Sequence, residues 1–151
     1  AITLMTEKGI SKDDFKSLHP SGKIGARLSS VQDVMHTGDA IPLASQDVTL
    51  SEALVIMTKK RFGCIGLTDA HGNLVGIITD GDLRRCLSGD ILGKDSRDIM
   101  TKKPVTISGQ ITVSSAISLM NKKKITSLFV LADGKPTGII HLHDLINISA
   151  L

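Results

Sequence analysis

One residue pattern occurs twice in this chain, and the repeat constrains the fold more than any other feature of the sequence. The stretch Gly76–Leu83 (GIITDGDL) returns as Gly138–Leu145 (GIIHLHDL). Upstream, Gln32–Met35 (QDVM) returns as Arg97–Met100 (RDIM). A unit that occurs twice usually packs against its copy, because one small unit buries too little apolar surface alone. We therefore expect two related units with a cleft between them.

The spacing of apolar residues predicts the elements of the first copy. Thr49-x-x-Glu52 has the pattern of a capping box. The residues that follow it are apolar at the spacing of one helix face: Leu50, Ala53, Leu54 and Met57. Two apolar runs at 64–68 and 74–79 predict buried strands joined by a turn, and a second helix is expected to begin near Asp82.

The second copy repeats these signals. Its helix has the same apolar spacing, at Val113, Ala116, Ile117 and Met120. Strands are expected at 127–131 and 137–140 around the tight turn Asp133-Gly134, with a last helix from about His143. We therefore predict an α/β (α+β) fold with two β-α-β-β-α units. The two sheets would pack face to face with pseudo-two-fold symmetry.

The repeat also sets the expected boundaries along the chain. The first unit spans 30–88 and the second spans 96–151, with a glycine-containing linker at 89–95. Residues 1–29 lie outside the repeat.

The composition of the 151 residues excludes several classes of protein. There is no Trp or Tyr and there are three Phe, so the core must be aliphatic and base-stacking platforms are absent. The net charge of +3 and the scattered cations argue against nucleic-acid binding. No apolar run approaches the length of a membrane span. The two distant cysteines, Cys64 and Cys86, and the lack of a signal-like segment predict the reducing cytoplasm.

Three features together resemble a CBS domain. They are Val34-Met35, the amphipathic helix that follows, and a strand that ends in the pattern Gly-Ile-Ile-Thr-x-x-Asp at 76–82. Because the pattern occurs in tandem, residues 30–151 resemble a CBS pair, also called a Bateman module.

Four stretches resemble more closely the C-terminal part of D-arabinose-5-phosphate isomerases: Leu18–Gly22, Asp33–Gly38, Thr79–Arg85 and His141–Leu145. In that family a sugar isomerase (SIS) domain precedes a CBS pair. The family interconverts D-ribulose 5-phosphate and D-arabinose 5-phosphate, which leads to Kdo and lipopolysaccharide. The resemblance implies that this chain is a fragment, and that residues 1–29 are the tail of the SIS domain plus a linker.

Thr79 and Asp82 form the first candidate site. A carboxylate can accept from both hydroxyls of a ribose, and a threonine hydroxyl can donate to a phosphate. The CBS resemblance implies those roles here. The same Thr-x-x-Asp spacing also has the pattern of a helix cap. Both interpretations can hold, because the cap lies where the ligand would bind.

The second copy departs from this pattern. His141 replaces the threonine, whereas Asp144 is retained. An imidazole can still bond a phosphate and attracts anions when protonated, so this pocket is expected to prefer another ligand or none. His141 and His143 alternate along the chain as two metal ligands would, but no third ligand is placed beside them, so no metal site is predicted.

The CBS resemblance further implies composite pockets, in which the aspartate of one copy faces the first strand and loop of the other. Asp144 would lie with three residues of the first copy: His36, Thr37 and Ile65. Thr79 and Asp82 would lie with three residues of the second copy: Lys103, Pro104 and Val105. A lysine there would neutralise a phosphate; exposure to solvent is the alternative.

The isomerase resemblance places a catalytic histidine at His19. Aldose–ketose isomerisation needs acid–base groups that move protons between adjacent carbons and oxygens. Without the SIS domain His19 would be inert, and an ordinary loop residue is the alternative interpretation.

Two functions follow as hypotheses. In the first, the CBS pair regulates the isomerase by binding AMP, ATP or a cytidine nucleotide sugar such as CMP-Kdo, with no required cofactor. In the second, it holds subunits together with empty clefts, as a dimer within a full-length tetramer. The lost threonine at His141 favours the second hypothesis. The sequence shows no nucleophile–base pair and no set of metal ligands with which this chain alone could catalyse a reaction.

Overall fold

The computed structural model describes residues 28–86 and 93–150. The candidate catalytic residue His19 and the expected SIS tail before residue 28 therefore lie outside the described residues. So does most of the expected linker at 89–95.

Both copies contain the predicted strand, helix, strand, strand, helix order. The elements of the first unit are β1 (Leu43–Ser45), α5 (Leu50–Lys60), β2 (Cys64–Thr68), β3 (Leu74–Thr79) and α6 (Asp80–Arg85). Those of the second unit are β5 (Thr106–Ser108), α8 (Val113–Lys123), β6 (Ser127–Ala132), β7 (Lys135–His141) and α9 (Leu142–Ala150). The predicted α/β class is confirmed.

Short leading segments precede each β-α-β-β-α unit along the chain. They are α4 (Val31–Val34) and the 3₁₀ turn η1 (Gly38–Ala40) before β1, and α7 (Ser96–Ile99) and β4 (Thr101–Lys102) before β5.

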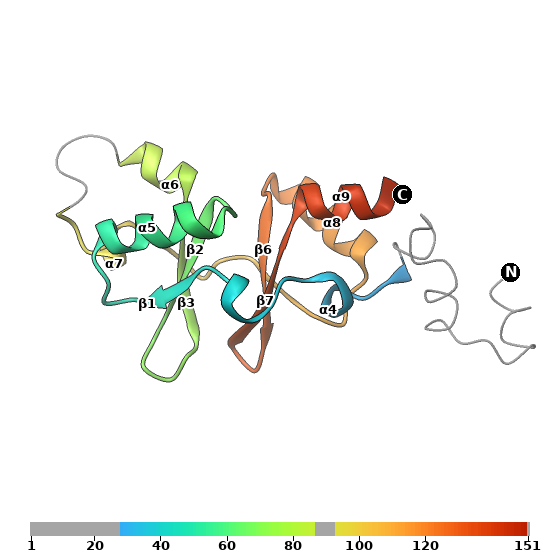
Figure 1. Ribbon diagram of the computed structural model, residues 1–151, viewed down its shortest axis with the longest axis horizontal. Helices are drawn as coiled ribbons and strands as arrows, with labels where there is room; N and C mark the ends of the chain where they lie inside the picture. Colours follow the sequence, from blue (N-terminus) through green and yellow to red (C-terminus); the bar gives the residue numbers. More distant parts are fainter. Residues whose placement is uncertain (1–27, 87–92, 151) are drawn as a thin grey trace, which may run out of the picture.

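Each unit has its own sheet. The strand orders are β1-β2-β3-β4 and β5-β6-β7. In both sheets the first pair is parallel and the following pair is antiparallel. The parallel pairs β1–β2 and β5–β6 each need a crossover, which α5 and α8 supply. Figure 1 shows α5 and α6 gathered around one β-hairpin and α8 and α9 around the other.

Local sequence signals account for where these elements begin and end. The Thr49 hydroxyl accepts from the Glu52 amide, and the Glu52 carboxylate accepts from the Thr49 amide, which confirms the predicted capping box. The β6–β7 turn has Asp133 at φ 53° and Gly134 at φ 80°. Positive φ at both central residues is the geometry of a type I′ turn, for which Asp-Gly is suited.

In the described part of the chain, three clusters of apolar side chains form the core. One lies between the helices and the sheet of each unit. A third includes Ile41, Cys64, Phe129 and Ile139, and joins the two sheets. The sheets approach closely at Gly66, where a Cβ would come within 2.9 Å of Phe129 Cζ in the other sheet. The face-to-face packing predicted from the repeat is therefore present.

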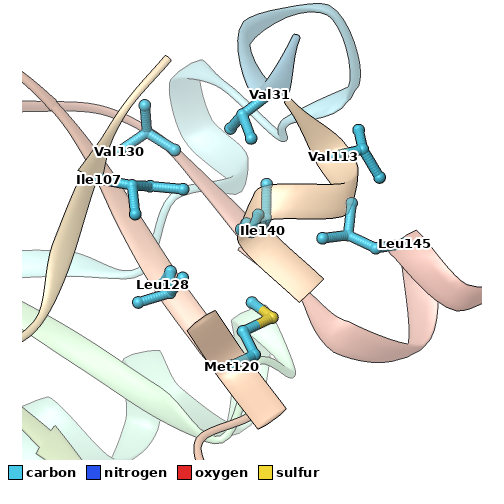
Figure 2. Close-up of a cluster of buried hydrophobic side chains, with 9 residues drawn as sticks. Val31, Ile107, Val113, Met120, Leu128, Val130, Ile140 and Leu145 are labelled. Carbon is cyan, nitrogen blue, oxygen red and sulfur yellow. The ribbon is translucent and has the colours of Figure 1, made fainter. Parts of the chain in front are cut away.

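The leading segments are exchanged between the units. Val31 of α4 is fully buried in the core of the second unit, where Figure 2 shows it beside Val130 and Ile140. Conversely, Ile99 of α7 is buried in the core of the first unit. Figure 1 shows α4 next to the second hairpin and α7 next to the first. Each unit is thus completed by residues that precede the other unit along the chain.

Backbone pairing and two glycines hold the exchanged segments in place. His36 and Ile139 exchange backbone hydrogen bonds of 2.9 and 3.0 Å, and β4 pairs with β3 through Thr101 and Ile77. A Cβ on Gly138 would overlap the sulfur of Met35, and one on Gly76 would overlap that of Met100. The repeated Met and Gly residues of the sequence therefore contact each other across the two copies.

Candidate ligand cleft

A cleft of about 810 Å³ opens between the two units. Clefts of this size hold small molecules such as nucleotides. Six of the predicted site residues line it: Thr79, Asp82, Lys103, Pro104, Val105 and His141. The first unit, the β4–β5 connection and the second unit all contribute to its walls.

The other predicted site residues do not line this cleft. The side chain of Ile65 is fully buried in the core of the first unit, and Cys64 is the residue of that strand that faces the cleft. Two others, His36 and Asp144, form a pair, and His143 stacks on His141. The last, Thr37, is the residue before η1.

Asp82 lines the cleft and is 5% exposed. Its Oδ2 accepts from the Thr79 amide at 2.9 Å and from the Thr79 hydroxyl at 3.1 Å. The Asp82 amide donates to the Thr79 hydroxyl at 3.2 Å, which completes the predicted capping box of α6. The cap therefore holds the carboxylate at the cleft wall.

Two further donors reach the other oxygen of Asp82. Oδ1 accepts from the Thr101 hydroxyl at 2.9 Å and from the guanidinium of Arg85, whose side chain is 70% exposed. Our sequence interpretation missed Thr101. The signal was present in the repeat, since Thr101 follows Met100 as His36 follows Met35.

His36 takes the corresponding place beside Asp144. Its Nε2 lies 2.8 Å from Asp144 Oδ2, and the two side chains are 42% and 48% exposed. The structure thus brings together two residues that the resemblance placed in one pocket. The second carboxylate is far more accessible to water than the first.

Aromatic rings surround this second carboxylate. The His141 and His143 rings stack with centroids 5.3 Å apart, and His36 meets Phe62 edge to face at 5.1 Å. The His143 amide donates to His141 Nδ1 at 3.2 Å, a bond that takes the place of the threonine cap. Burial lowers the pKa of His141, assisted by His143 and His36 and opposed by Asp144. The neutral imidazole is therefore more favoured at His141 than in a free histidine.

The charged side chains that line the cleft in the described part of the chain are mostly cationic. Five are basic (Arg61, Arg84, Arg85, Lys103 and Lys124) and two are acidic (Asp80 and Asp82). Three of the basic residues, Arg61, Lys103 and Lys124, have left-handed backbone conformations, with φ between 52° and 66°. For Arg61 and Lys124 this conformation is the left-handed C-cap that ends α5 and α8, a common way for a helix to end.

Other chemistries find little support in the described residues. Burial raises the pKa of the Cys64 thiol to about 12, so it is not a reactive thiolate. Within residues 28–86 and 93–150, no three histidine, cysteine or acidic side chains are grouped as a metal site would require. None of the helices in these ranges combines the length and apolar character needed to cross a membrane.

Known proteins resemble this chain over nearly its whole length. Arabinose 5-phosphate isomerase KdsD of Pseudomonas aeruginosa is 39% identical over 150 residues, which cover 97% of this chain and 46% of that protein. The KdsD protein of Escherichia coli is 35% identical over 149 residues. An uncharacterized protein of Rickettsia prowazekii is 47% identical over 141 residues, or 93% of this chain and 44% of that protein. The chain spans less than half the length of these relatives.

Solved structures share the fold. The CBS domain pair of protein MJ0100, in complex with 5′-methylthioadenosine and S-adenosyl-L-methionine, superimposes with a TM-score of 0.72 and is 26% identical. The match covers 82% of this chain and 97% of that one. CBSX2 in complex with AMP gives a TM-score of 0.70 at 24% identity, with coverages of 81% and 96%, which shows the shared fold.

The family model described as "CBS domain" matches residues 31–89 and 97–150, one match for each copy of the repeat. These two stretches are more than half of the chain and include both aspartates and the residues that line the cleft. The chain therefore belongs to the CBS domain family and contains a tandem pair of such domains.

Proposed function

We propose that this chain is the regulatory, nucleotide-binding part of an arabinose-5-phosphate isomerase. The observation that carries the proposal is the cleft, in which a buried aspartate stands among an excess of cations. The cations attract phosphate, and the carboxylate is suited to a ribose diol. A nucleotide carries both groups.

The likeness to the MJ0100 pair supports an adenosine moiety, since both ligands of that protein contain one. AMP and ATP are therefore the first candidates. CMP-Kdo is a second candidate, because a cytidine nucleotide sugar carries the same ribose and phosphate and is the activated product downstream of the isomerase.

The parent activity is proposed from the KdsD relatives, which this chain matches over 97% of its own length. In that proposal residues 1–29 are the end of a SIS domain with its linker, and His19 acts only when that domain is present. The two CBS domains extend over 30–88 and 96–151. The chain alone binds ligand and does not isomerise sugar phosphates. Two free cysteines fit the reducing cytoplasm in which the substrate would be found.

Calorimetric titration of the chain with AMP, ATP, CMP and CMP-Kdo tests the ligand proposal. We expect binding of at least one, and an affinity lower by about tenfold or more in Asp82→Asn, because hydrogen bonds to a charged group contribute most. Asp98→Asn is the matched control, since Asp98 is exposed on α7 outside the cleft. Absence of heat and of any thermal shift with all four ligands would overturn the proposal.

A second candidate function is assembly of subunits with empty clefts. It is favoured by Asp82 and Asp144, whose carboxylates already have partners within the chain. Light scattering after size-exclusion chromatography distinguishes the two. The assembly function predicts an oligomer of the same size in Asp82→Asn and no response to nucleotides, and a nucleotide response that Asp82→Asn abolishes would reject it.

A further inference from the structure

The carboxylate of Asp82 is fully engaged within the chain. A carboxylate accepts about four hydrogen bonds. Four donors reach Asp82: the amide and hydroxyl of Thr79, the hydroxyl of Thr101 and the guanidinium of Arg85. A ribose diol must therefore displace one of these donors before it can bind the carboxylate.

Arg85 is the donor that costs least to displace. Thr79 is the N-cap of α6, and its amide is fixed by the backbone at the end of β3. Thr101 belongs to β4, which is paired with β3. The Arg85 side chain, in contrast, is 70% exposed and is held by a surface ion pair, an interaction that contributes little to stability.

The Arg85 side chain already forms part of the cleft wall. Arg85 lines the cleft together with Arg84 and Lys103. In the present position Arg85 Nη1 lies close to Gly81, where a Cβ would be 3.7 Å away. A guanidinium matches two oxygens of a phosphate with two parallel N–H donors, as well as it matches those of a carboxylate. A phosphate joined to the ribose therefore gives Arg85 a new partner when the diol takes its place.

We propose that Arg85 sets the preference of this cleft for phosphorylated over unphosphorylated nucleosides. The Arg85 guanidinium competes with the ribose for the Asp82 carboxylate. Its lost ion pair is replaced only when the ligand carries a phosphate. The inference rests on the proposed nucleotide-binding function, and it assigns to Arg85 a role in specificity that differs from simple charge attraction.

Calorimetry with adenosine and AMP, repeated with cytidine and CMP, tests this on the wild-type chain and on Arg85→Ala. We expect the variant to bind the nucleoside several-fold more tightly, because the competitor is gone. It should bind the nucleotide more weakly, because a phosphate partner is lost. The ratio of nucleotide to nucleoside affinity should fall by about tenfold or more, the range of a charge-assisted bond.

Two matched variants separate this mechanism from loss of charge. Arg84→Ala removes the neighbouring cation without freeing Asp82, so it should weaken the nucleotide and should not strengthen the nucleoside. Arg97→Ala removes the exposed ion pair between Arg97 and Asp47, neither of which lines the cleft. It should change neither the nucleotide affinity nor the nucleoside affinity. Arg85→Gln repeats the test if Arg85→Ala loses its circular dichroism signal.

The outcomes are distinguishable. If Arg85→Ala and Arg85→Gln leave nucleoside affinity unchanged or reduced, the inference is wrong while the nucleotide function stands. If the wild-type chain binds neither nucleotides nor nucleosides, both are overturned.

Discussion

Asp82 and Asp144 occupy equivalent positions in the two units but have different surroundings. Asp82 is buried and has a threonine hydroxyl and an arginine on one oxygen, whereas Asp144 is half exposed and pairs with His36. The difference arises from the residues after the repeated methionines, Thr101 and His36. The chemical asymmetry between the two copies therefore begins with single substitutions in the repeat.

His141 is expected to make the fold sensitive to mild acid. Its pKa is lowered in the folded chain by burial, so below about pH 6.5 the unfolded chain binds more protons. Stability is therefore retained above this pH and lost as the pH falls below it. In His141→Gln this loss is absent, so we expect a smaller decrease in Tm between pH 7.5 and 5.5, measured by circular dichroism.

The control for this prediction is His71→Gln, in the β2–β3 turn and away from His36, His143 and Asp144. It should keep the pH dependence of the wild-type chain. Parallel curves of Tm against pH for His141→Gln and the wild type would contradict the prediction.

At the scale of elements, the contact between the two sheets depends on Gly66 of β2. A Cβ there would lie 2.8 to 2.9 Å from side-chain atoms of Leu43, Leu74 and Phe129. Because three side chains would have to move at once, we expect Gly66→Ala to lower the free energy of unfolding by about 1–3 kcal/mol. Urea denaturation measures this change.

Gly81→Ala is the matched control. Gly81 lies within helix α6. A Cβ built there would be 3.5 and 3.7 Å from the nearest side-chain atoms, which are ordinary contact distances. Alanine there should be neutral or stabilising by up to about 1 kcal/mol, since glycine weakens helices. Equal stability of Gly66→Ala and the wild type would show that the sheets adjust without cost.

The elements that could be predicted are those set by local chemistry. Strands β2 and β3 have the predicted limits, because each apolar run is bounded by turn residues or a cap. Helix α6 begins at Asp80 and not near Asp82, because Thr79 is its N-cap and the helix starts directly after it. Strand β7 begins at Lys135, earlier than expected, because the two-residue turn lets Ala132 pair with Lys135.

The arrangement that could not be predicted depends on contacts distant in sequence. The apolar residue Val31 has the same local pattern whichever unit it packs against, so the exchange of α4 and α7 was not visible. Likewise, the spacing of Thr79 and Asp82 indicated a cap and a candidate site. The i,i+3 spacing of Asp82 and Arg85 permits their ion pair, but nothing local showed that Thr101 reaches the carboxylate from β4.

At the scale of the whole molecule, the exchanged segments make the two units depend on each other. A fragment of residues 1–89 would lack Ile99 of its own core, and a fragment of residues 90–151 would lack Val31 of its core. We therefore expect each fragment alone to show little cooperative thermal unfolding by circular dichroism. The equimolar mixture should regain a single transition, because both cores are then complete.

The control is the same mixture with Val31→Asp in the first fragment, which places an unpaired charge in the second core and should prevent recovery. A fragment of residues 90–151 that unfolds alone at the Tm of the intact chain would show that the exchange contributes nothing.

The exchange also bears on how the two units can move relative to each other. Each leading segment pairs with the other unit, and the chain then continues into the unit that follows the segment in sequence. The described chain therefore crosses between the units after His36 and again at Lys103–Val105. The second crossing is a wall of the cleft. A molecule bound in the cleft would contact this crossing, which connects one unit to the other. We therefore expect such a ligand to restrict the movement of the two units relative to each other.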